Sequence, residues 1–319
     1  MKKPFKIVIC VLIFACILMI ISQPEIYVKS AYEGIKLWAT TVLPALLPFF
    51  FLTALLSSLG VTRVIARVFQ SPCRILFGTS GASAYAFIMS LLSGYPIGAK
   101  TVCDLFQSGV IDKDEATKCS TFCSTSGPIF IVGSVGYAMF KSKQVGFLIL
   151  ITHILSALLC GIIFRFYSKQ NDYKPFFISP KKSENALYDC VYSSVISVSL
   201  VGGFICIFCL FLDAFKQLGV FTPLINLMPN KNSSQLLSGF LYGLIECTKG
   251  CKTLSISGLS PFSAALSSSL ISFGGFSVWA QSIIFLTRAN CKISIFCMSK
   301  ILQALFSFFL CFLLYPLVI

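Results

Sequence analysis

Long apolar runs separated by short polar stretches make up almost the whole chain. Two of the runs, residues 78–106 and 233–257, are interrupted by Gly, Ser and charged residues near their centres. In lipid these residues would leave backbone groups unpaired, so we expect both stretches to fold as re-entrant helical hairpins. The other runs are about twenty residues long and predict an all-α polytopic membrane protein. Its spans are expected near residues 7–22, 35–59, 119–140, 145–166, 191–212, 262–286 and 293–318.

The order of these elements predicts two repeats of opposite orientation. Each repeat has a span, then a hairpin, then a broken span, and an extra crossing between the repeats inverts the second one. Inverted repeats with broken helices are the usual build of alternating-access transporters. We expect a first transmembrane helix (1–30), a first repeat (31–144), a connecting span with a basic cytoplasmic loop (145–190), a second repeat (191–290) and a last transmembrane helix (291–319).

Composition excludes a soluble domain and suggests an orientation. The chain has 319 residues, 56% hydrophobic and 11% charged, and a mean hydropathy of +0.88. The net charge of +14 comes from Lys and Arg in the gaps between apolar runs rather than from one basic face, which argues against nucleic-acid binding. Most of these residues lie inside if the N-terminus is cytoplasmic. We therefore expect a multi-pass protein of the cell membrane, with the lipid bilayer as a partner and the N-terminus in the cytoplasm.

Cysteine spacing gives no sign of a metal or redox centre. Most of the 15 cysteines fall inside apolar runs, where they serve as small hydrophobic side chains. Cys206 and Cys209 have CxxC spacing, but no second pair and no histidine lies near them in the sequence. We expect neither a metal nor another cofactor, and the sequence does not identify a coupling ion.

Polar breaks recur at corresponding places of the two halves and predict a substrate site. Residues 93–100 correspond to 243–250, and residues 124–128 correspond to 272–277. A broken helix turns free N–H groups and a positive dipole end toward the middle of the membrane, which suits an anion. The alternative is that small residues only allow close helix packing. The candidate binding residues are Ser93, Gly94, Tyr95, Pro96, Gly98, Lys100, Thr125, Ser126, Gly127, Pro128, Glu246, Lys249, Ser272, Gly274, Gly275 and Ser277.

Charged residues in these breaks need a reason, because each costs about 2.5–3.5 kcal/mol at bilayer depth. Glu246 either forms a structural ion pair with Lys249, three residues further on, or serves the substrate or a coupling ion. Lys100 and Lys249 either attract an anionic substrate or extend to the interface. We expect Asp213 at the interface. We also expect Asp112, Asp114 and Glu115 to be solvated and to cap the helix that follows them.

Several stretches carry a resemblance to a known family. They are residues 37–38 and 43–50, the sequence SGYPIGAK at 93–100, residues 124–128 and residues 272–281. With them the chain resembles the nucleoside-recognition or Gate-domain membrane proteins, and among these the YlbJ-like sporulation integral membrane proteins, over nearly its whole length. The resemblance implies a fold similar to that of concentrative nucleoside transporters, with hairpins and broken helices around the site. It also implies a role in moving dipicolinate across the outer forespore membrane. Related folds often assemble as homo-oligomers.

These observations favour a transporter of a small organic anion that works by alternating access. Dipicolinate is an aromatic dianion, and Tyr95 and Phe276 are available to contact its ring. A nucleoside or nucleobase transporter, the first alternative, would use the same hydroxyl groups together with Glu246. A scaffold that recruits other sporulation membrane proteins, the second alternative, would need no substrate site.

An intramembrane protease is the remaining alternative. Gly78, Thr79, Ser80 and Gly81 match the GxSG motif of rhomboid proteases, and His153 is the single histidine of the chain. Such a protease needs the serine within hydrogen-bond reach of a general base. The motif opens a hairpin, and no small residues around His153 bring helices close to it. We therefore expect no enzyme.

Overall fold

A computed structural model describes residue 14, residues 17–168 and residues 185–319. All regular secondary structure in these ranges is helical. The predicted first span, 7–22, lies mostly outside the described residues, as does most of the predicted basic loop before residue 185.

Four helical segments within the described ranges are long and apolar enough to cross a membrane. They correspond to the last four predicted spans, and two bent helix pairs raise the possible number to six. The fold class of an all-α polytopic membrane protein is therefore confirmed. The four segments are α9 (Lys143–Phe164) with the short η3 (Arg165–Tyr167), α10 (Ala186–Gln217), α14 (Pro261–Phe273) with α15 (Gly275–Arg288), and α16 (Ile293–Val318).

The predicted span at 35–59 is bent rather than straight. Three consecutive elements form it: α2 (Pro24–Leu37), the π-helical η1 (Trp38–Val42) and α3 (Leu43–Ser58). Its two straight parts meet at an angle of 54°. Pro44 and Pro48 have no backbone N–H, so two helical hydrogen bonds are missing next to the bend.

Both predicted hairpins are present as pairs of packed helices. The first joins α6 (Ala82–Ser93) to α7 (Ile97–Gln107), and the second joins α12 (Lys231–Ile245) to α13 (Cys247–Ile256). Gly94 turns the first tip with a φ of 79°, which glycine adopts without strain. The second tip is a single extended residue, Glu246. The connecting helices are α4 (Val61–Val68), α5 (Gln70–Phe77), α8 (Lys113–Ser120) and α11 (Thr222–Ile225).

The two predicted broken spans differ in extent. The second is interrupted where expected, at Gly274, whose φ is 88° between α14 and α15. The first, predicted at 119–140, holds one short apolar helix, η2 (Ile129–Met139), of 11 residues. Residues 121–127 before it are not helical, and α8, which precedes them, is polar. Even at the roughly 1.5 Å per residue of an α-helix, η2 would cover only about half of a bilayer core, so this segment is not a full span.

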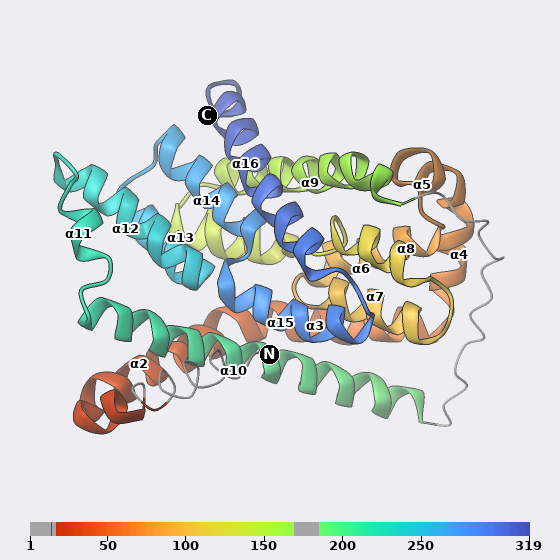
Figure 1. The fold of residues 1–319 in the computed structure, drawn as a ribbon, viewed down its shortest axis with the longest axis horizontal. Coiled ribbons are helices and arrows are strands. Elements are labelled where there is room, and N and C mark those ends of the chain that lie inside the picture. The colour runs from red at the N-terminus through yellow and green to blue at the C-terminus, as the bar shows by residue number, and fades with distance from the viewer. Residues whose placement is uncertain (1–13, 15–16, 169–184) are drawn as a thin grey trace.

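Two hydrophobic clusters form most of the core. One joins α5–α8 to α15 and the start of α16, and the other joins η2, α9, α13, α14 and α16. In Figure 1, α9 runs along one side of the molecule and α10 along the opposite side, where it packs on α2 and α3. The hairpins and broken helices lie between these two sides, so the breaks are enclosed by protein.

We expect Gly136 to tolerate no side chain. Helices η2 and α9 touch there, and a Cβ on Gly136 would lie 2.4 Å from the Cα of Gly146. Gly136→Ala should force the helices apart and lower the free energy of unfolding by about 1–3 kcal/mol, measured by thermal unfolding in detergent. Gly133→Ala is the control on the same helix, because its Cβ would meet only Ile129 Cγ2, at 3.9 Å. An equal loss in both variants would contradict the close approach.

Candidate functional site

A small cavity lies where the tips of both hairpins meet two helix breaks. The first break is residues 124–128, and the second break is at Gly274. Its volume is about 60 Å³, which holds a few water molecules and is less than an organic ligand needs. The hairpin tips, the two breaks and the helix starts next to them contribute Gly94, Tyr95, Ser126, Gly127, Glu246, Cys247, Thr248, Ser277, Val278 and Gln281. An apolar wall from η1, α3, η2 and α10 contributes Val42, Leu46, Phe130, Val201 and Ile205.

Four helices begin at this cavity. Helix α7 starts after Pro96, η2 after Pro128, α13 after Glu246 and α15 after Gly274. The first N–H groups of a helix have no partner within it and carry the positive end of its dipole. Glu246 caps α13 with its side chain, whereas the structure describes no side-chain cap on the other three helices. Four helix N-termini, which favour negative charge, therefore meet at the cavity, next to the C-termini of α6, α12 and α14.

The first hairpin tip lies in direct backbone contact with the first break. A Cβ on Gly94 would lie 2.8 Å from the backbone N of Gly127. A Cβ on Gly98 would lie 1.7 Å from the carbonyl oxygen of Cys123. Both positions therefore need glycine, because a side chain at either would separate α7 from the break.

Glu246 caps a helix and does not pair with the Lys249 side chain. Its carboxylate accepts from the backbone N–H of Lys249 at 2.8 Å and from the Thr248 hydroxyl at 3.1 Å. The Lys249 ammonium instead lies 3.4 Å from Asp213, which also pairs with Lys216. The bridge considered from the sequence is not formed, because the extended backbone at Glu246 turns its carboxylate onto the start of α13.

His153 joins the two breaks. It is fully buried on α9, and its Nε2 accepts from the backbone N–H of Ser126 at 2.9 Å. A neutral ring that accepts at Nε2 carries its proton on Nδ1, which lies 2.8 Å from the Ser272 hydroxyl oxygen and can donate to it. This side chain thus pairs a backbone N–H that would otherwise lack a partner inside the membrane.

The loop before the first break differs from the sequence-based expectation at Glu115. Asp112 caps α8 as predicted, because its carboxylate accepts the N–H groups of Asp114 and Glu115. Glu115 itself is buried and not solvated, since its carboxylate accepts the backbone N–H of Ser80 at 2.6 Å. The contacts of His153 are with Ser126 and Ser272, not Ser80, so the serine–histidine pair of a protease is not formed.

Lys300 had no predicted role, yet its hydrogen bonds join the first hairpin tip to both breaks. It is fully buried on α16, and its ammonium donates to the Tyr95 hydroxyl at 3.0 Å and to Gln303 Oε1 at 2.7 Å. It also donates to the carbonyl oxygens of Ser124 and Ser272, one at each break. The only sequence signal for this role was a lysine inside the last apolar run.

The predicted site residues fall into three groups. Those that line the cavity are Gly94, Tyr95, Ser126, Gly127, Glu246 and Ser277. Those that form the tips and breaks behind it are Ser93, Pro96, Gly98, Thr125, Pro128, Ser272, Gly274 and Gly275. Lys100 and Lys249 are partly buried and do not line it. Phe276, expected near a substrate ring, is 44% exposed and packs on Phe273 and Trp279 instead.

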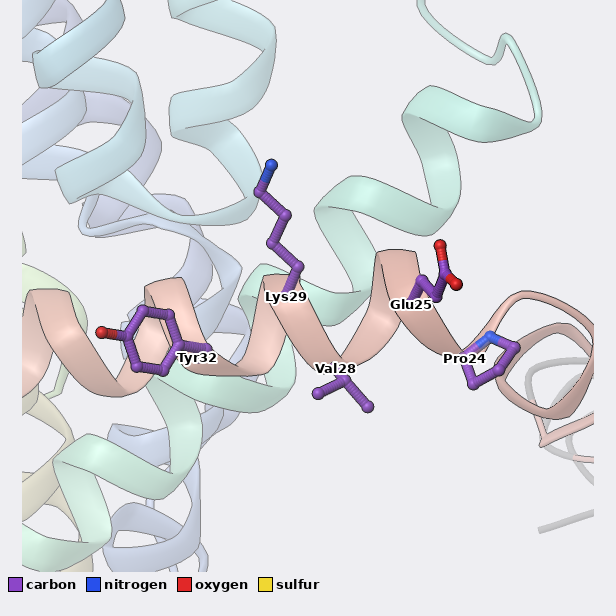
Figure 2. Close-up of a pocket in the computed structure, with 5 residues that line it drawn as sticks. All are labelled: Pro24, Glu25, Val28, Lys29 and Tyr32. Carbon is purple, nitrogen blue, oxygen red and sulfur yellow. The ribbon is translucent and has the colours of Figure 1, made fainter.

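A larger hollow, of about 580 Å³, lies along α2 (Figure 2). Its lining residues, Pro24, Glu25, Val28, Lys29 and Tyr32, belong to this one helix, and their side chains point in different directions. A ligand site needs polar groups that converge on an enclosed space. We therefore place the candidate site at the smaller cavity.

We expect His153→Leu to destabilise the protein strongly. The change leaves the Ser126 N–H and the Ser272 hydroxyl unpaired, and each buried group costs about 1–3 kcal/mol. The free energy of unfolding should therefore fall by about 2–5 kcal/mol in detergent. Ser156→Ala is the control, because this equally buried hydroxyl bonds to a carbonyl of its own helix, at 2.8 Å. A similar, small effect of both changes would show that His153 does not hold the breaks.

Comparison with known proteins agrees with the motif-based resemblance. The chain is 30% identical to the sporulation integral membrane protein YlbJ of Bacillus subtilis (strain 168), over 90% of this chain and 77% of that protein. No family model and no solved structure matches the chain. On this identity and coverage, the chain belongs to the family of YlbJ-like sporulation integral membrane proteins.

Proposed function

We propose that this chain transports a small organic anion, and that the anion is dipicolinate, moved across the outer forespore membrane during sporulation. One observation carries the proposal: α7, η2 and α15 begin at a single buried cavity without side-chain caps. The sporulation context is supported by the name of the relative. The substrate class is supported by the chemistry of the helix ends, which bind anions through N–H groups and dipoles.

The groups around the cavity suit a flat dianion. Dipicolinate carries two carboxylates on an aromatic ring, so it can accept hydrogen bonds from two helix ends at once. The hydroxyl groups of Ser126 and Ser277 line the same cavity and can donate as well, whereas the Thr248 hydroxyl already donates to Glu246. Tyr95 and the apolar wall around Val201 supply surfaces for the ring.

Substrate entry requires movement. The cavity holds about 60 Å³, far below the roughly 300 Å³ of a small ligand pocket. Its polar side comes from hairpins and breaks, and its apolar side comes mainly from α3 and α10. We propose that the hairpins and broken helices move as a unit against α3 and α10 and open the cavity to each side in turn.

A neutral nucleoside is the rival substrate, because Glu246 lines the cavity and could accept from ribose hydroxyls. Its carboxylate already accepts from the Lys249 N–H and the Thr248 hydroxyl, which leaves less capacity for a nucleoside. The anion is therefore favoured. Glu246 is also the residue that would carry a coupling proton or cation.

Orientation and assembly also belong to the proposal. Arg67 and Arg74 lie on α4 and α5, and the end of α5 adjoins Arg165, whose carbonyl oxygen would lie 3.4 Å from a Cβ on Gly78. Arginines thus gather at one end of the molecule, which favours a cytoplasmic position for that end and for the N-terminus. By analogy with related folds, we propose that the protein forms a homo-oligomer.

Proteoliposomes with the purified protein should take up labelled dipicolinate saturably, and excess nucleoside should not compete. Ser277→Leu should abolish this uptake, because the larger side chain fills a cavity of about 60 Å³. Ile284→Phe adds volume on the exposed face of the same helix and should leave uptake within about twofold.

The same assay separates the rivals. Uptake that nucleoside suppresses would favour a nucleoside transporter. No uptake of either compound, by folded protein present in both orientations, would leave the scaffold role.

A further inference from the structure

Lys300 is fully buried, and its partners favour the ammonium form, because two backbone carbonyls and Gln303 Oε1 can only accept and together use three N–H donors. Its ammonium has three N–H donors, and four acceptors surround them: Tyr95, Ser124, Ser272 and Gln303. The acceptors are a phenol oxygen, two backbone carbonyls and a side-chain amide, so all of them are neutral. Their hydrogen bonds satisfy the donors without cancelling the charge.

This charge has no counter-ion among the residues that the structure describes, whose ion pairs involve Asp213. The other buried charge near the cavity, Glu246, is compensated locally, since its carboxylate lies on the positive end of α13. An uncompensated cation at this depth is expensive and therefore calls for a functional explanation.

Tyr95 connects the cation to the cavity. The Lys300 Nζ lies 4.9 Å from the centroid of the Tyr95 ring, and Tyr95 lines the cavity. A bound substrate would thus lie one aromatic ring away from the ammonium, in surroundings where water screens charge poorly. Two residues that accept from Lys300 also have a buried polar atom without a hydrogen-bond partner in the described structure, Gln303 Nε2 and Ser124 Oγ.

We propose that Lys300 makes the site select anions. Its positive charge lies on the far side of the Tyr95 ring from the cavity and attracts the substrate without touching it. The inference rests on the proposed anion transport and names the source of its charge selectivity. Lys300 takes the role that the sequence suggested for Lys100 and Lys249. Neither of those lines the cavity, and Lys249 is paired with Asp213. Lys300 is thus a specificity-determining residue.

The test compares affinities for dipicolinate and for its neutral diamide, pyridine-2,6-dicarboxamide, by titration calorimetry of the purified full chain. Lys300→Met removes the charge. Gln303→Glu keeps the lysine but places a carboxylate where an amide oxygen now lies 2.7 Å from Nζ. Both changes should lower the preference for the dianion at least about tenfold, because both remove the excess positive charge. Lys300→Arg should keep the preference.

A purely structural role for Lys300 predicts a different pattern. Lys300→Met would then lower stability, while Gln303→Glu, which adds an ion pair, would leave the preference unchanged. Lys292→Met is the charge-matched control, because Lys292 is exposed at the start of the same helix and should not affect the preference. Lys300→Gln replaces Lys300→Met if that variant does not fold.

The outcomes for the two proposals can be told apart. If folded Lys300→Met and Gln303→Glu proteins keep the dianion preference, this inference is overturned and the proposed function stands. If the unchanged protein binds both compounds equally, or binds neither, the proposed anion transport is overturned and this inference falls with it.

Discussion

Backbone hydrogen bonding at the helix breaks is the constraint on which the rest of this structure depends. No water is available inside a bilayer to pair the N–H and C=O groups that a break releases. Side chains from distant helices pair them here: His153 on α9 accepts from the Ser126 N–H, and Lys300 on α16 donates to the Ser272 carbonyl. Glu246 does the same for the start of α13. Polar residues that would be costly in a simple span are therefore used to hold irregular backbone in place.

Carbonyl groups at helix C-termini and N–H groups at helix N-termini are not paired equally by side chains at this site, and this difference gives the cavity its electrostatic character. Lys300 covers carbonyl oxygens at Ser124 and Ser272, the second of which lies in the last turn of α14. The starts of α7, η2 and α15 receive no side-chain cap in the described structure. Lys300 thus pairs a carbonyl of one helix end that would repel an anion, while the uncapped N-termini leave N–H donors near the cavity beside the Glu246 carboxylate. This pairing supports the proposed preference for an anion.

Much of the fold was predictable because a membrane allows few solutions. Apolar length located the long spans, and Gly and Pro located both hairpin tips and the break at Gly274. The short reach of η2 was not predictable, since the apolar run does not show that a polar helix precedes it. The lining of the site was predictable wherever it is backbone, as at Gly94 and Gly127. The side chains that hold it were not, because a lone Lys300 or His153 in an apolar run carries no pattern that reveals its distant partners.

The contacts divide the helices into two groups whose boundary passes through the cavity. On one side, Asp213 of α10 accepts from Ser30 of α2, and Trp38 of η1 donates to the carbonyl of Val198 at 3.0 Å. These helices also share an apolar cluster. On the other side, the buried histidine of α9 and lysine of α16 join both breaks. The polar contacts across the boundary include the ion pair of Asp213 with Lys249 and a hydrogen bond of 3.0 Å from the Ser93 hydroxyl to the Thr53 hydroxyl of α3, while α3 and α10 present apolar side chains to the cavity. Apolar surfaces slide without losing hydrogen bonds, so opening along this boundary breaks only the few polar contacts that cross it. We therefore infer that the breaks, the histidine and the lysine move as one body, which keeps the charge and geometry of the site constant while its access changes.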